Sequence, residues 1–131
     1  MNTKLLMICS SIFMGIIGFT LLFLPEEIET FLQIGQNSTS TMFLKLLSAL
    51  MLGFAFLNWM AKSNLIGGIY SRPVVIGNFT HFVIGFLSLI KLISPKQPNN
   101  EVIILLALAY GIFTFFFGFI FFKTPNLNSK G

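Results

Sequence analysis

The chain has 131 residues, of which 55% are hydrophobic and 9% are charged, and it contains 17 phenylalanines. A soluble domain needs a larger charged fraction to cover its surface. The formal net charge of +4 is small, and the basic residues form no long patch, so we expect no nucleic-acid partner. This composition predicts a polytopic membrane protein that forms one transmembrane domain, residues 1–131, and has the lipid bilayer as its surroundings.

The first predicted span covers about residues 5–24, an uninterrupted apolar run that follows Lys4. About 20 residues at a rise of roughly 1.5 Å each cross the roughly 30 Å hydrocarbon core of a bilayer. A secretory signal peptide also has a charged start, but its apolar region is shorter and ends in small residues. Because this run ends in the sequence LFLP, we expect a span that is retained.

Residues 25–35 have the pattern of a short amphipathic helix that lies in the membrane interface. Pro25 suits the first helical position, and Gly35 suits a stop. The predicted apolar face carries Ile28, Phe31 and Leu32, and the predicted polar face carries Glu26, Glu29 and Gln33. A cation site formed by the three glutamates of this segment, Glu26, Glu27 and Glu29, is the weaker interpretation, since acidic faces are usually solvated.

Three more spans follow, separated by short polar segments. The predicted order is a capping loop at 36–41, spans at about 41–60, 73–93 and 101–122, links at 61–72 and 94–100, and a polar tail at 123–131. Ala49 and Gly53 would form a smooth stripe for helix contact, Gly67-Gly68 a turn, and Asn100 a cap. Short links place consecutive helices side by side, so the predicted fold class is all-α, a four-helix up-down-up-down transmembrane bundle.

The charges predict an orientation. One side of the predicted bundle carries five basic residues and no acidic one: Lys4, Lys62, Arg72, Lys123 and Lys130. The other side carries three lysines together with all four glutamates: Lys45, Lys91, Lys96, Glu26, Glu27, Glu29 and Glu101. Because basic residues accumulate on the cytoplasmic side, we expect both termini in the cytoplasm.

The third span holds the only histidine, His81, which lies between Gly77 and Gly85 on one helix face. Polar groups on four spans fall at a similar depth, in the cytoplasmic half, and each would be costly if it faced lipid. The candidate ligand-binding residues at this level are His81, Asn78, Asn58, Thr114 and Tyr110. They predict a small polar-lined pocket or, alternatively, interhelical hydrogen bonds that only fix the packing. For Asn58 and Asn78 the packing interpretation is favoured, whereas for His81 both stay open.

The sequence lacks the residues that several kinds of membrane-protein chemistry require. The spans contain no Asp or Glu, which argues against a proton-coupled exporter. A single cysteine, Cys9, provides no thiol pair for disulfide chemistry, and a single histidine cannot supply both axial ligands of a haem. We therefore expect no catalytic residue, no metal site and no resident cofactor.

The order of parts resembles a known group of proteins. A first span that ends in Leu-Pro, a short amphipathic segment, a second span with small residues and then the stretch GGIYSRPVVIGNFTHFVIGFLSLIK resemble small four-span bacterial membrane proteins of unknown function, loosely grouped with the DoxX-like family. The resemblance implies a multi-pass protein of the bacterial inner membrane. Some DoxX-like proteins are linked with quinone-dependent oxidation. No functional residue is carried over, because no established catalytic motif is available to match.

The sequence thus predicts a non-enzymatic binding or accessory protein whose pocket takes a lipid-like or other small apolar ligand. One alternative is a subunit of a quinone-linked membrane oxidoreductase, in which His81 donates a hydrogen bond to a quinone oxygen. A small transporter is another alternative. A second copy of the chain or another membrane protein is a candidate partner.

Overall fold

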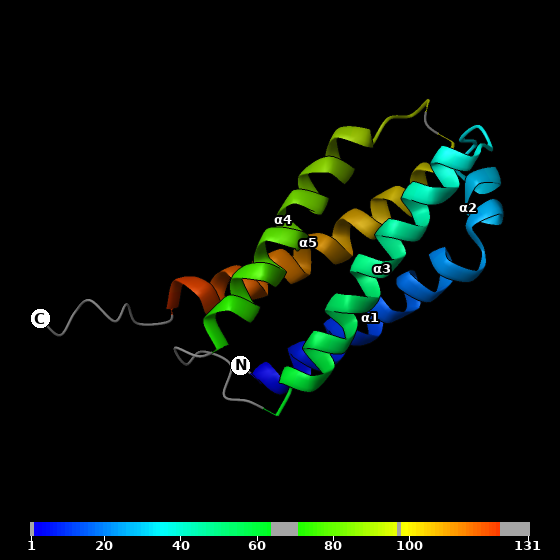
Figure 1. The fold of residues 1–131 in the computed structure, drawn as a ribbon. Helices are drawn as coiled ribbons and strands as arrows, with labels where there is room; N and C mark the ends of the chain where they lie inside the picture. The colour runs from blue at the N-terminus through cyan, green and yellow to red at the C-terminus, as the bar shows by residue number, and fades with distance from the viewer. Residues whose placement is uncertain (1, 64–70, 97, 124–131) are drawn as a thin grey trace, which may run out of the picture. The chain divides into compact units, whose positions relative to one another are not determined.

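The computed structural model describes residues 2–63, 71–96 and 98–123. Five helices lie within these ranges (Figure 1): α1 (Thr3–Phe23), α2 (Pro25–Phe31), α3 (Ser38–Ala61), α4 (Arg72–Leu92) and α5 (Asn100–Lys123). The predicted Gly67-Gly68 turn and most of the predicted tail lie outside the described residues.

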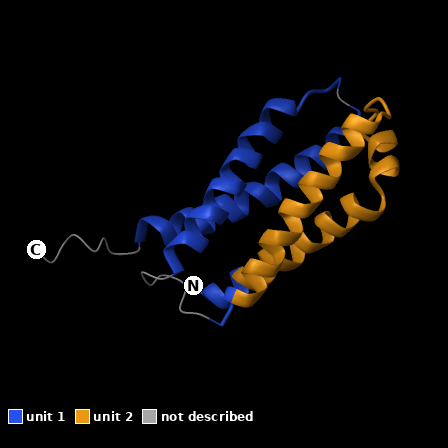
Figure 2. Ribbon diagram, viewed as in Figure 1, with its two compact units in different colours: residues 1–6, 61–131 blue, residues 7–60 orange. Residues whose placement is uncertain are grey.

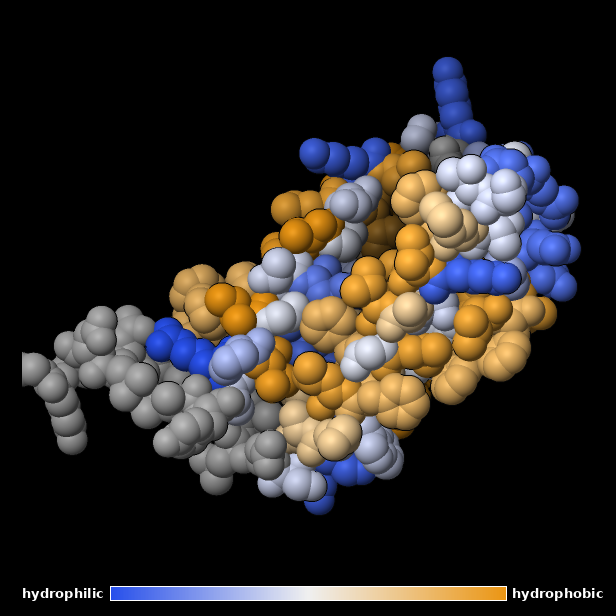
Figure 3. All heavy atoms as spheres, in the orientation of Figure 1, coloured by the Kyte–Doolittle hydropathy of each residue, from blue (hydrophilic) through white to orange (hydrophobic). Residues whose placement is uncertain are grey.

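Four of the helices, α1, α3, α4 and α5, are long and apolar enough to cross a membrane. Their ends lie within one helical turn of the predicted spans, and α2 follows the first span as expected. Hydrophobic side chains dominate the visible face of the molecule (Figure 3). The described residues form no strand, so the predicted all-α fold class with four membrane spans is confirmed.

The chain divides into two compact units (Figure 2). One unit comprises residues 7–60, which hold most of α1 together with α2 and α3. The other comprises residues 1–6 and 61–131, which hold α4 and α5.

In the unit of residues 7–60, α1 and α3 pack antiparallel through small polar residues. The Ser11 hydroxyl donates to the carbonyl of Ala55 at 2.7 Å, and the Ser48 hydroxyl donates to the carbonyl of Gly18 at 2.9 Å. Gly18 follows Ser11 in α1, whereas its partner Ser48 precedes Ala55 in α3, so the two helices run in opposite directions. Each hydroxyl shares a backbone oxygen of the neighbouring helix and so avoids facing lipid unpaired.

The predicted Ala49–Gly53 contact stripe is wrong. Both residues are exposed, and a Cβ atom added to Gly53 would meet no atom within 4 Å. The buried positions of α3 are instead Ser48, Met51, Ala55, Asn58 and Ala61. These buried positions also follow helical spacing. Ser48 and Asn58 among them form hydrogen bonds to α1, which the side chains of alanine and glycine cannot form.

α2 is shorter than predicted because its chain turns before Gly35. The helix ends at Phe31, and Gln33 adopts a left-handed conformation with φ of 56°. The N–H of Gln33 donates to the carbonyl of Thr30 at 3.1 Å, and the N–H of Ile34 donates to that of Glu29 at 2.9 Å. This pair of bonds is a Schellman motif, which ends a helix with a left-handed residue in the position of Gln33. Pro25 begins the helix as predicted.

The predicted polar face of α2 is wrong at one residue. Glu29, expected on the solvated face, is only 1% exposed. The Glu29 carboxylate accepts hydrogen bonds from hydroxyls in the first turn of α3, which turn this side of α2 inward. The loop before α3 acts as predicted, since the Asn37 side chain accepts the N–H of Ser40 at 2.9 Å and caps the helix.

In the other unit, α4 and α5 form an antiparallel pair in which glycines make room for aromatic rings. A Cβ atom added at any of three glycines would overlap a ring of the facing helix. The pairs are Gly85 with Tyr110, Gly111 with Phe86, and Gly118 with Phe79. Each of these glycines thus receives an aromatic side chain of the facing helix.

Asn100 does not cap α5 as predicted. It is the first residue of the helix, and its side-chain oxygen accepts the N–H of Ser94 at 3.2 Å across the turn. The carbonyl of Asn99, which has a φ of 56°, accepts the N–H groups of Val102 at 3.0 Å and Ile103 at 3.3 Å. The Asn100 side chain therefore closes the link between α4 and α5.

Candidate functional site

His81 and Tyr110 form a pair between α4 and α5. The Tyr110 hydroxyl lies 3.4 Å from Nε2 of His81, and the ring centroids are 5.7 Å apart. This is a long hydrogen bond, in which either group can donate, depending on the imidazole tautomer. Tyr110 is 6% exposed and His81 is half-buried. Both are among the five candidate ligand-binding residues named from the sequence, and the structure brings these two together.

Local packing explains why the two rings meet. Gly85 lies one turn after His81, and its missing side chain leaves the space that the Tyr110 ring fills. Phe82, with no exposed surface, lies edge-on to both rings, with its centroid 5.3 Å from each. Edge-on aromatic contacts of this kind are favourable and restrict the rings. The pair is thus held by a glycine on one side and a buried phenylalanine on the other.

Asn78 and Thr114 lie in the same α4–α5 unit, and each bonds to its own helix. Nδ2 of the buried Asn78 donates to the carbonyl of Val74 at 2.9 Å. The Thr114 hydroxyl donates to the carbonyl of Tyr110 at 2.8 Å. Such bonds to the preceding turn give a polar side chain one partner within its own helix.

Asn58 belongs to the other unit, where it joins α3 to α1. Its Nδ2 atom donates to the Ser10 hydroxyl at 3.0 Å and lies 3.9 Å from the sulfur of Met14. Asn58 and Ser10 have no exposed surface, and Ser10 in turn donates to the carbonyl of Met7 at 3.1 Å. This is a hydrogen-bond network within the helix pair, the arrangement that the sequence favoured for Asn58.

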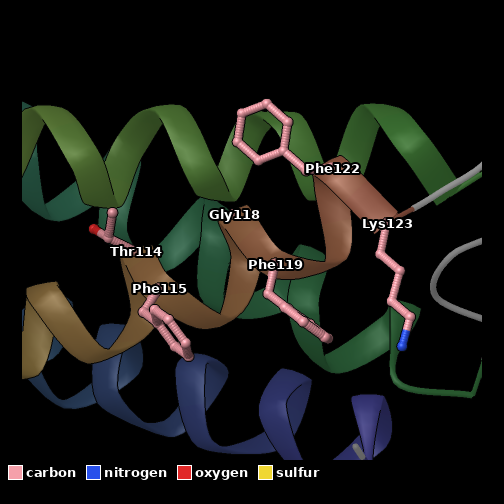
Figure 4. Close-up of a pocket in the computed structure, with 6 residues that line it drawn as sticks. All are labelled: Thr114, Phe115, Gly118, Phe119, Phe122 and Lys123. Atoms are coloured by element: carbon pink, nitrogen blue, oxygen red, sulfur yellow. The ribbon is translucent and has the colours of Figure 1, made fainter.

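A groove runs along α5 toward its C-terminal end (Figure 4). It has a volume of about 530 Å³ and an almost wholly apolar surface, and it is lined by Thr114, Phe115, Gly118, Phe119, Phe122 and Lys123. Thr114, at one end, is the predicted ligand-binding residue that lines it. Phe115 and Phe119 project from the same side of the helix and are 68% and 46% exposed. The groove is therefore an apolar surface with aromatic walls.

The end of the groove is cationic. Nζ of Lys123 lies 5.1 Å from the centroid of the Phe119 ring, a cation–π arrangement. At the same end of the helix pair, the guanidinium of Arg72 lies 5.7 Å from the centroid of the Phe121 ring. This groove was not identified from the sequence. The available signal was Gly118 within the run of phenylalanines, with Lys123 one turn after Phe119.

The described residues contain no group of three or more His, Cys, Asp or Glu side chains that could hold a metal ion. No family model, no curated protein and no solved structure matches the chain. What the fold defines is its class: the chain is an all-α membrane protein with four spans.

Proposed function

We propose that this protein is a non-enzymatic binding or accessory protein of the bacterial inner membrane, and that it holds an anionic, lipid-like ligand along α5. The observation that carries this proposal is the apolar groove that ends at Lys123. Both termini lie in the cytoplasm in this proposal, because the basic excess is on their side. The groove then lies in the cytoplasmic half of the bilayer.

The shape and chemistry of the groove support an amphiphile as the ligand. Lys123 lies nine positions after Thr114, so the groove extends over roughly 13 Å, about the depth of one leaflet. Exposed phenylalanines offer an apolar wall for an acyl or isoprenoid chain. Lys123 offers a positive charge for a phosphate or carboxylate, and Arg72 adds a second at the same end of the helix pair.

In this proposal the five candidate residues named from the sequence have different roles. Thr114 contacts the chain of the ligand at the inner end of the groove, and Tyr110 and His81 form the polar group one turn beyond. Asn78 fixes α4, and Asn58 fixes the pair of α1 and α3.

Lipid analysis of purified variants tests this function. The protein is purified in a mild detergent, and the lipids that remain bound are extracted and quantified by mass spectrometry. We expect Lys123→Gln to lose most of the bound anionic lipid, because one of the two charges near the head group is removed. Lys91→Gln is the matched control, since Lys91 is also exposed in the last turn of its helix. Equal retention by both variants contradicts the proposal.

The quinone-linked oxidoreductase is the second candidate, and one observation favours it. A phenol and an imidazole lie 3.4 Å apart between α4 and α5, and both can donate a hydrogen bond to a quinone oxygen. The resemblance to DoxX-like proteins supports the same proposal. An absorbance spectrum and a quinone assay of the purified protein distinguish it, because quinone that is present in the wild type and lost in His81→Phe would favour this function over lipid binding.

A further inference from the structure

The Glu29 carboxylate is buried with one oxygen unsatisfied. Glu29 is 1% exposed, and its Oε1 atom accepts the Ser40 hydroxyl at 2.6 Å and the Thr41 hydroxyl at 3.0 Å. Its Oε2 atom is buried and has no hydrogen-bond partner. A buried charge without full pairing is costly, and one oxygen of this carboxylate still needs a proton donor or a cation.

The turn beside this carboxylate is rich in oxygen atoms. The Ser40 hydroxyl lies 3.2 Å from the Gly35 carbonyl oxygen and 3.0 Å from that of Asn37, in addition to Glu29. The Thr41 hydroxyl lies 3.1 Å from the Asn37 oxygen, in addition to Glu29. Each hydroxyl has one proton, so the two hydroxyls can donate to only two of these five acceptor contacts at a time.

We propose that Glu29 and the turn of residues 35–41 bind a small monovalent cation of the size of sodium. Carboxylate, hydroxyl and carbonyl oxygens are the ligands that hard cations prefer, and non-helical carbonyls coordinate sodium in other membrane proteins. A single carboxylate balances a single positive charge. Glu26 and Glu27 are exposed and take no part, so the site differs from the cluster of three glutamates considered from the sequence.

Mg²⁺ and Ca²⁺ fit the site less well. Mg²⁺ demands an octahedral shell and usually retains several waters, whereas this carboxylate is buried. Protein sites for Ca²⁺ commonly use six to eight oxygen ligands with more than one carboxylate. The cation balances Glu29 and ties α2 to the first turn of α3, which predicts that it stabilises the fold.

Thermal unfolding in detergent tests the site independently of the groove on α5. The Tm of the wild type is measured across a NaCl series that is kept at constant ionic strength with choline chloride. A ligand that binds only the folded state raises the Tm progressively with its concentration. We expect this sodium-dependent rise in the wild type and in Glu27→Gln, the matched control. We expect none in Glu29→Gln, which keeps the shape of the side chain and removes its charge.

Three outcomes separate the proposal from simpler roles of Glu29. A wild-type Tm that is the same in NaCl and in choline chloride would overturn it and leave a protonated or merely helix-capping carboxylate. Sodium dependence that persists in Glu29→Gln would also overturn it. If Glu29→Gln does not fold, Ser40→Ala serves as the second variant, since it keeps the charge and removes one oxygen ligand; its sodium dependence should move to higher NaCl concentrations, and an unchanged dependence counts against the site.

Discussion

Replacement of Gly85 by alanine should destabilise the α4–α5 pair through a single added methyl group. The new Cβ atom would lie 2.6 Å from Cδ1 of Tyr110 and closer still to Cε1, whereas ordinary contacts begin at 3.4 Å. Cδ1 must therefore move by about 0.8 Å, the difference between these two distances, and Cε1 by more. Tyr110 is 6% exposed and lies against Phe82, so the movement also strains its neighbours. Overpacking of this kind typically costs about 1–3 kcal/mol.

Gly53→Ala is the control for this variant. Both glycines lie inside long helices, so both replacements gain a similar helix propensity, which is up to about 1 kcal/mol in water. At Gly53 the added atom meets nothing within 4 Å. The difference between the two variants thus isolates the overlap with Tyr110, and we expect about 1–3 kcal/mol in the free energy of unfolding.

The assay is unfolding in mixed micelles of mild detergent and dodecyl sulfate, followed by circular dichroism. A double variant that combines Gly85→Ala with Tyr110→Leu should be less destabilised than the sum of its two parts, because the smaller side chain relieves the overlap. Equal stability of Gly85→Ala and Gly53→Ala, or strict additivity in the double variant, would refute the packing of Tyr110 against Gly85.

Two further predictions concern topology and Asn58. In a Cys9→Ala background, a cysteine at Thr30 should react with an impermeant reagent added outside the cell, and a cysteine at Ser63 should react only after the membrane is opened; the reverse pattern would reject the proposed orientation. Asn58→Leu should cost about 0.6 kcal/mol, the average for an interhelical hydrogen bond in a membrane, because it removes the bond to Ser10. A cost above about 2 kcal/mol in the same unfolding assay would show that Asn58 does more than fix the packing.

The four spans could be predicted because their signal is local. Apolar length decides whether a helix crosses the membrane, and the polar residues next to each span mark its ends. Asn37 caps α3 from within the loop where a cap was expected. These features depend on a few neighbouring residues, and no knowledge of the packing is needed to find them.

The packed faces were harder to predict, since each depends on the facing helix. Ala49 and Gly53 offer the smoother stripe on α3, yet the stripe that includes Ser48 is buried, because the Ser48 hydroxyl reaches a carbonyl of α1. Similarly, α2 has only seven residues, so its sequence pattern cannot fix which side turns inward. The hydroxyls of Ser40 and Thr41 decide this, and they bury Glu29.

The contacts of the candidate residues were harder to predict than their positions. Polar residues within apolar spans stand out in any sequence, which identified His81 and Tyr110 as candidates. Their pairing depends on the register of α4 against α5, which the ring of Tyr110 beside Gly85 fixes. The groove on α5 was missed because phenylalanines that line a groove and phenylalanines that face lipid have the same sequence pattern.

Native mass spectrometry of the wild-type protein, released from a mild detergent, tests the proposed function most directly. The method reports the mass of a bound molecule together with the number of protein subunits. The proposal predicts a retained species with the mass of an anionic lipid, which Lys123→Gln loses and Lys91→Gln keeps. A protein that carries quinone, flavin or haem, or that retains no small molecule at all, would contradict it.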